Sequence, residues 1–190
     1  MKTLYLLAGC NGAGKTTAAF TLLPGLLGCR EFVNADEIAR GLSPFQPETV
    51  SIQAGRLMLA RLHELLAAGE TFALETTLAT RHYLRFVQEA RVEGYVVRLL
   101  FFWLNSTDLA VERVAARVRE GGHSIPEPVI RRRYEGGLRQ FFQGYRHAVD
   151  SWSFIDNSNG AGEPVAESNG SDTVVFNKFV WQFLTATYDV

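Results

Sequence analysis

Apolar residues in the first half of the chain gather into short continuous runs, and segments with helical spacing lie between them. Such runs, bounded by turn residues, are typical of strands buried on both faces. We expect strands at residues 3–8, 31–34, 71–77 and 95–104. The segments between them predict helices at 17–23, 47–68 and 81–93. This alternation predicts an α/β fold with a parallel sheet flanked by helices.

The second half of the chain continues the pattern and then changes it. A helix is expected at 107–120, capped by Ser106 or Thr107, and a second begins near residue 127 after a Gly-Gly break. A strand and loop start at 154–158, and strands at 163–168 and 172–176 suggest a hairpin across Asn169-Gly170. An amphipathic helix at 177–188 follows. With no internal repeat, 190 residues predict a single domain, 1–190.

The helix expected at 47–68 carries its own start and stop signals. Pro47 suits the first turn, and Gly69 suits the position after the last turn. Leu57, Leu62, Leu65 and Leu66 give it an apolar stripe that predicts packing against the sheet.

The loop after the first strand reads Gly9-Cys10-Asn11-Gly12-Ala13-Gly14-Lys15-Thr16, which is the P-loop (Walker A) pattern G-x-x-x-x-G-K-T between a strand and a helix. Glycines let successive backbone N–H groups turn inward as an anion nest, and the helix N-terminus adds its positive end. A glycine-rich turn that binds nothing is the alternative. The pattern favours ATP and Mg²⁺, with Thr16 on the metal and Lys15 as a catalytic contact to the phosphates. The expected ATP-binding residues of the loop are Asn11, Gly12, Ala13, Gly14, Lys15, Thr16 and Thr17.

Two acidic residues stand at the ends of predicted strands. Asp36 follows the second strand and Glu75 ends the third, followed by Thr76. Ligands of open α/β sheets bind at this edge. Asp36 is therefore a candidate substrate residue, with a helix N-cap for 37–40 as the alternative. Glu75 is a candidate to assist Mg²⁺ or to hold substrate.

Arginine is unevenly distributed. The net charge of −1 argues against broad nucleic-acid binding. Eight of sixteen arginines nevertheless fall between Arg113 and Arg146, against three lysines in the whole chain. Arginine offers a planar fork of donors that suits phosphates. Two arginine-bearing helices joined by a glycine break predict a small helical lid at about 113–135 that closes over phosphates. A pair of solvated arginine-rich helices is the alternative.

The two cysteines, Cys10 and Cys29, indicate no disulfide framework and favour a reducing, cytoplasmic setting. Residues 7–10 look like a lipoprotein cleavage box, but the preceding apolar run of about five residues is shorter than a secretory signal requires. No apolar stretch reaches the roughly 18 residues of a membrane span.

Taken in order, these motifs resemble the zeta toxin family of P-loop kinases, known from epsilon/zeta toxin–antitoxin pairs. The resemblance covers about residues 3–158. It rests on the segments 9–16, 34–38, 74–78, 117–123, 130–134 and 156–158. It looks closest to a short bacterial branch, because the longer toxins have extra helices around the sugar nucleotide.

The resemblance implies a kinase that moves the γ-phosphate of ATP to a hydroxyl of a UDP-activated amino sugar such as UDP-N-acetylglucosamine. Asp36 would be the catalytic base, and Glu75 with Thr76 would hold the sugar nucleotide or the metal shell. Catalytic Arg119 and Arg132 would stabilise the transferring phosphoryl group. The remaining implied ATP contacts are Arg113 on the adenine and Arg117 on the phosphates, by similarity to nucleoside monophosphate kinases, and Asn157. A possible antitoxin is the implied protein partner.

Two other functions remain open from the sequence alone. One is a nucleoside or polynucleotide kinase, whose polynucleotide form is weakened by the lack of a broad basic surface. The other is a nucleotide-dependent switch ATPase without an acceptor, which the placement of Asp36 and the arginine-rich segment disfavours.

Overall fold

A computed structural model describes residues 1–122 and 124–189 of the chain. Within these residues one seven-stranded sheet runs in the order β2-β3-β1-β4-β5-β6-β7. The first five of these strands are mutually parallel, and β6 and β7 are antiparallel additions at one edge. The strands are β1 (Thr3–Gly9), β2 (Glu31–Val33), β3 (Phe72–Thr76), β4 (Val96–Trp103), β5 (Ser151–Asp156), β6 (Glu163–Ser168) and β7 (Thr173–Val175). The expected α/β fold with a parallel sheet is confirmed.

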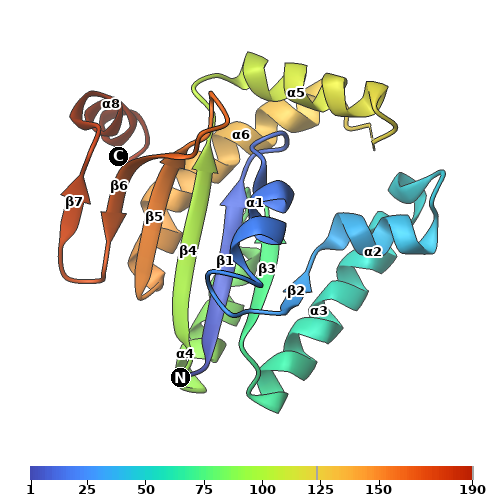
Figure 1. The fold of residues 1–190 in the computed structure, drawn as a ribbon, viewed down its shortest axis with the longest axis horizontal. Helices are drawn as coiled ribbons and strands as arrows, with labels where there is room; N and C mark the ends of the chain where they lie inside the picture. Colours follow the sequence, from blue (N-terminus) through green and yellow to red (C-terminus); the bar gives the residue numbers. More distant parts are fainter. Residues whose placement is uncertain (123, 190) are drawn as a thin grey trace.

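Helices connect the parallel strands and cover the sheet. Figure 1 shows α1 in front of the sheet and α4 and α6 behind it. The helices are α1 (Lys15–Leu22), α2 (Ala35–Leu42), α3 (Ser51–Ala68), α4 (His82–Val92), α5 (Thr107–Arg119), α6 (Glu127–Gln140), α7 (Arg146–Ala148) and α8 (Lys178–Tyr188). Two further turns are a 3₁₀-helix, η1 (Pro47–Val50), and a π-helical segment, η2 (Phe141–Tyr145).

The apolar run of β1 lies at the centre of the sheet, between β3 and β4. Every residue of β1 is buried, because helices cover both faces of a parallel sheet. The register sets Leu7 beside Glu75 of β3, so the strand before the P-loop lies next to the strand that carries this carboxylate. The carboxyl ends of β1, β2 and β3 consequently meet at one edge.

An aromatic cluster fills the core between β4, β5 and η2. Phe101, Phe141 and Phe154 have ring centroids 5.0–5.1 Å apart. Trp181 of α8 stacks on Trp152 of β5 with centroids 5.3 Å apart, so α8 closes this end of the core. Rings of this size bury large apolar areas and contribute much of the stability of a small core.

Several expected boundaries need correction. The helix expected at 47–68 begins as a 3₁₀ turn and becomes α-helical only at Ser51. Its buried stripe is Ala54, Met58, Leu62 and Leu65, whereas Leu57 is 44% exposed. The last parallel strand begins at Ser151, three residues earlier than expected. The hairpin of β6 and β7 is confirmed, and its turn holds Gly170 at φ 100°, a conformation that favours glycine.

No helix in the described ranges is both long and apolar enough to span a bilayer. His123, which belongs to the segment resembling zeta toxins, lies outside the described residues.

Candidate active site

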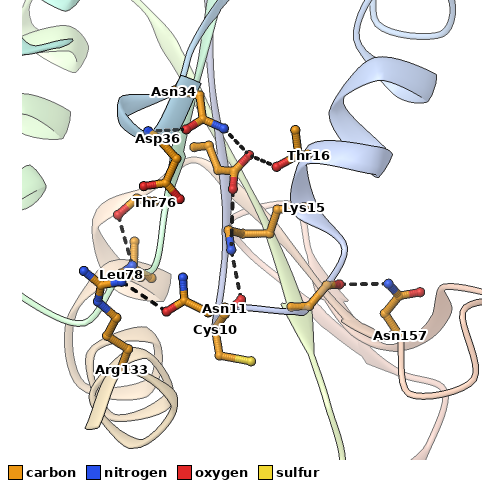
Figure 2. Close-up of polar contacts among 12 residues, drawn as sticks. Cys10, Asn11, Lys15, Thr16, Asn34, Asp36, Thr76, Leu78, Arg133 and Asn157 are labelled. Carbon is orange, nitrogen blue, oxygen red and sulfur yellow. Dashed lines mark hydrogen bonds and ion pairs between the residues drawn. The ribbon is translucent and has the colours of Figure 1, made fainter. Parts of the chain in front are cut away.

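The P-loop joins β1 to α1 in a conformation that depends on its glycines. Gly14, at the N-cap of α1, has φ 84°, and a Cβ there would lie 2.5 Å from the side-chain nitrogen of Asn157. Gly12 has φ 81°, and a Cβ would come within 3.0 Å of the Ala110 carbonyl. These left-handed residues leave the loop backbone free to surround an anion at the start of α1. Asn157 Nδ2 donates to the Ala13 carbonyl at 2.8 Å and holds the loop from the β5 side, as Figure 2 shows.

Glu75 is the polar centre of the site. Its Oε2 accepts hydrogen bonds from Thr16 Oγ1 at 2.8 Å and Asn34 Nδ2 at 2.9 Å. Its Oε1 lies 3.6 Å from Lys15 Nζ, and both side chains of this ion pair are nearly buried. Lys15 Nζ also donates to the Cys10 carbonyl at 2.9 Å. Figure 2 shows these contacts converging on one carboxylate between the P-loop and α2.

Asp36 occupies the first turn of α2, and it is not the cap of that helix. Asn34 is the N-cap, because its Oδ1 accepts the backbone N–H of Asp36 at 2.8 Å. The capping interpretation of Asp36 is therefore wrong. With the capping function taken by Asn34, the Asp36 carboxylate lines the cavities on both sides of Lys15.

Two cavities meet at this edge of the sheet. The first, about 210 Å³, is lined by the P-loop together with Thr17, Arg113 and Arg117. The second, about 300 Å³, extends from the P-loop over the β3–α4 loop to Met58 of α3. We label them the nucleotide cavity and the acceptor cavity, after the ligands expected from the sequence. Four residues line both cavities: Asn11, Lys15, Asp36 and Glu75. A group bound in either cavity therefore lies against the same cation, Lys15, and the same two carboxylates, Asp36 and Glu75.

Arg133, which was not among the site residues expected from the sequence, lines the acceptor cavity. Its Nη1 donates to Asn11 Oδ1 of the P-loop at 3.2 Å. Burial lowers the pKa of the Arg133 guanidinium, and the nearby Asp36 carboxylate opposes that shift. A guanidinium between the P-loop and an acid is well placed for a phosphoryl group.

The other expected arginines divide into two groups. Arg113 and Arg117 line the nucleotide cavity, and Arg113 Nη2 donates to the Ser158 carbonyl at 2.7 Å. Arg119 and Arg132 are exposed and line neither cavity. The structure therefore does not bring these two together with Lys15 and Asp36.

Helical phase, at about 100° per residue, separates these arginines. On α6 the buried stripe contains Ile130, Tyr134 and Leu138. Arg132 points roughly opposite to this stripe, whereas Arg133 flanks it. The same spacing puts Arg119 opposite the stripe of α5 and Arg117 within it. This signal was present in the sequence and would have placed Arg132 away from the core, but it does not distinguish Arg133 from Arg131 on the other flank of the stripe.

The predicted lid at 113–135 contains an anchored part. Tyr134 Oη donates to the Leu104 carbonyl at 2.6 Å and accepts from Trp103 Nε1 at 3.0 Å, so the middle of α6 is tied to the end of β4. Arg131 bridges the two helices through Asp108 at 2.7 Å. Closure of this region over phosphates stays a prediction.

The donor set next to the P-loop fits Mg²⁺. A hydroxyl and a carboxylate, Thr16 and Glu75, lie 2.8 Å apart at the start of α1. Magnesium prefers such oxygen ligands and commonly takes its other ligands from water and substrate phosphates. In residues 1–122 and 124–189 no group of three or more His, Cys, Asp or Glu side chains forms a metal cluster.

Cys10 lies within the loop and is buried. Burial raises the pKa of its thiol to about 11, against the lowering effect of Lys15. The thiol therefore stays protonated near neutral pH and packs as a small apolar group.

Comparison with known proteins identifies the family to which this chain belongs. A family model described as "AAA domain" matches residues 4–140. The chain belongs to this family. An uncharacterized protein of Haemophilus influenzae is 29% identical over 126 residues, which cover 66% of this chain and 88% of that protein.

Solved structures share the fold at low sequence identity. A chain of the AvrRxo1-ORF1:AvrRxo1-ORF2 complex with ATP matches with a TM-score of 0.76 and 20% identity, over 97% of this chain and 64% of that one. A protein of the PezAT toxin–antitoxin system of Streptococcus pneumoniae matches with a TM-score of 0.69 and 16% identity, over 99% and 78%. Shikimate kinase from Acinetobacter baumannii gives 0.51 and 18%, over 98% and 92%. The chain thus has a P-loop kinase fold, and it spans less than two thirds of the AvrRxo1 chain.

Proposed function

We propose that the protein is an ATP-dependent kinase that phosphorylates a hydroxyl group of a small molecule. The observation that carries this proposal is the pair of cavities that share Asn11, Lys15, Asp36 and Glu75 as a common wall. A switch ATPase needs a site for nucleotide and water, whereas a kinase needs a second site for an acceptor. The acceptor cavity supplies that second site.

The chemistry assigns roles to Lys15, Asp36 and Glu75 of the shared wall and to Arg133 beside it. The acceptor oxygen attacks the γ-phosphorus of ATP, a new O–P bond forms, and the bond to the β-phosphate oxygen breaks to release ADP. Asp36 takes the proton of the acceptor hydroxyl. Lys15 and Arg133 lie against the transferring group and offset its charge. Glu75 orients Lys15 and Thr16 through the contacts described above.

Magnesium, held by Thr16 and Glu75 together with the nucleotide, would neutralise charge on the phosphates. The glycine-dependent loop supports ATP as the donor, since its backbone leaves an anion nest at the start of α1. Arg113 and Arg117 line the same cavity and are proposed to contact the nucleotide. Asn157 holds the loop at Ala13, so we assign it to positioning of the ATP site.

The acceptor proposed from the zeta toxin resemblance is a UDP-activated amino sugar, with Thr76 as a further contact. Similarity in fold to a protein of a toxin–antitoxin system supports a toxic activity and an antitoxin partner as part of this proposal. The free buried thiols of Cys10 and Cys29 support a reducing, cytoplasmic location.

Release of ADP tests the proposal when it is measured with and without acceptors. The panel contains UDP-sugars, free sugars, nucleosides and short oligonucleotides, and each product is identified by its mass. We expect ADP release to depend on the acceptor, together with a mass gain of one phosphate on that acceptor. ADP release that no acceptor increases would instead identify a switch ATPase.

A further inference from the structure

The acceptor cavity has no surplus positive charge. Its lining includes two permanent cations, Lys15 and Arg133, two carboxylates, Asp36 and Glu75, and the imidazole of His82. Lys15 is already paired with Glu75 and with the Cys10 carbonyl. Arg133 donates to Asn11 and feels the opposite charge of Asp36. In the proposed reaction these two cations serve the transferring phosphoryl group, so neither of them is left for a charged acceptor.

The rest of the wall offers hydroxyl and alkyl groups, the amide of Asn34 and the imidazole of His82. Thr76, Thr77 and Thr80 line the cavity, together with Ala79 and Met58. Thr76 Oγ1 accepts the backbone N–H of Leu78 at 3.0 Å, which leaves its own proton to donate to a ligand. Neutral donors and acceptors of this kind match the hydroxyl groups of a polyol.

The loop that carries these threonines is held in a fixed conformation. Leu78 is buried with φ 56°, the single non-glycine residue with positive φ among those described. The buried hydroxyl of Tyr145 donates to the Thr80 carbonyl at 2.9 Å and accepts the Tyr83 N–H at 3.1 Å. Strained backbone that persists under such support is common where a ligand is bound. The wall is therefore pre-organised and need not be ordered by the acceptor.

The volume of the cavity also favours a small acceptor. Its volume, about 300 Å³, is at the small end of ligand-binding pockets, which span roughly 300–1,000 Å³. A monosaccharide suits this space, whereas a nucleotide sugar is several times larger. The nucleoside diphosphate of a UDP-sugar would thus lie outside the cavity.

We infer that the acceptor cavity recognises a neutral polyol of monosaccharide size, and that the nucleoside diphosphate of a UDP-sugar adds little to recognition. This inference rests on the proposed kinase function and specifies its acceptor. Burying a phosphate without a cationic partner costs more than burying hydroxyl groups that find hydrogen bonds. A free sugar carries no charge, so the hydrogen-bonding and apolar groups that line the cavity are sufficient to bind it.

The test is a charge series on one sugar. Initial rates are measured with N-acetylglucosamine, N-acetylglucosamine 1-phosphate and UDP-N-acetylglucosamine, and again with glucose, glucose 1-phosphate and UDP-glucose. We expect at least one neutral sugar to be phosphorylated, with a kcat/KM equal to or above those of its charged derivatives. A charged derivative that exceeds its neutral sugar tenfold or more in both series would overturn the inference.

A variant pair links the result to the cavity. Thr77→Val keeps the shape of the side chain and removes one lining hydroxyl, and we expect kcat/KM for the neutral sugar to fall about tenfold. Thr185→Val is the matched control, since the Thr185 hydroxyl donates to the Trp181 carbonyl on α8. The KM for ATP should stay unchanged in both variants. Equal effects of the two substitutions on the sugar would contradict this assignment of the cavity.

The two proposals fail in different ways. If only nucleosides or oligonucleotides are phosphorylated, the kinase function stands and the sugar inference is wrong. If no compound of any class increases ADP release, the kinase function itself is wrong. If only the UDP-sugars are phosphorylated, the proposed kinase function is supported and the inference of a neutral acceptor is wrong.

Discussion

Replacing Arg133 by alanine distinguishes the site seen in the structure, which contains Arg133, from the site expected from the sequence, which contains Arg132. Arg133 lines the acceptor cavity and donates to Asn11 of the P-loop, whereas the neighbouring Arg132 is exposed. Arg133→Ala and Arg132→Ala remove the same side chain from adjacent positions of α6. The two variants thus differ in where the charge was and not in what was removed.

Coulomb's law sets the scale of the effect. At an effective dielectric constant of about 20, a unit charge roughly 4–6 Å from the transferring phosphoryl group contributes about 3–4 kcal/mol. This corresponds to about 10²- to 10³-fold in kcat. The exposed Arg132 is screened by water and salt, so its removal should change kcat by no more than about threefold.

The assay is steady-state kinetics with the best acceptor from the panel. We expect Arg133→Ala to lower kcat by about 10²- to 10³-fold with a smaller change in the KM for ATP, because the contact strengthens in the transition state. Thermal melting checks that both variants fold. The reasoning is refuted if Arg132→Ala costs as much as Arg133→Ala, or if Arg133→Ala raises only the KM for ATP.

Three further outcomes follow from the contacts. Lys15→Ala should lower the rate of phosphoryl transfer by roughly 10³-fold or more. Its Tm should move only a few degrees, because Thr16 and Asn34 still donate to Glu75. Full activity in this variant would contradict the assignment of the ATP site. Tyr145→Phe should raise the KM for the acceptor severalfold and leave the KM for ATP unchanged. Tyr95→Phe should change neither KM, because the Tyr95 hydroxyl donates to the Glu70 carbonyl, far from the β3–α4 loop. Burial raises the pKa of Cys10 from 9.0 to about 11, so the folded chain retains the thiol proton in a range where the unfolded chain loses it. Unfolding in denaturant should therefore show the parent losing more stability than Cys10→Ala as pH rises from about 9 to 11, and equal losses would contradict the burial of this thiol.

The fold and the P-loop were predictable from local patterns. The continuous apolar runs of β1 and β4 identify strands buried on both faces, and the order of strands and helices identifies the parallel sheet. Glu75 was found because it ends a strand, and parallel strands present their ends at one edge. These features depend only on residues close together in the sequence.

Contacts between distant elements were not predictable in the same way. The hydrogen bond from Asn34 to Glu75 joins two residues that are 41 positions apart, at the ends of two strands. No local sequence pattern predicts this contact. Arg133 was missed for a different reason, since a run of three adjacent arginines hides helical phase unless each one is placed against the buried stripe. The start of β5 at Ser151 was missed because a search for continuous apolar runs passes over Ser151 and Ser153, although their alternation with Trp152 and Phe154 is itself a strand pattern.

Substitution of Asp36 tests the central claim of a kinase with an acceptor site. Asp36→Asn keeps the shape of the side chain but neither carries charge nor takes a proton from the acceptor. Isothermal titration with a non-hydrolysable ATP analogue and Mg²⁺ is run beside the product assay on the best acceptor. We expect nucleotide affinity within about threefold of the parent and a loss of transfer of about 10²- to 10⁴-fold, the range of general-base catalysis. Transfer that persists in Asp36→Asn while nucleotide binding weakens would contradict the account and place Asp36 with the metal.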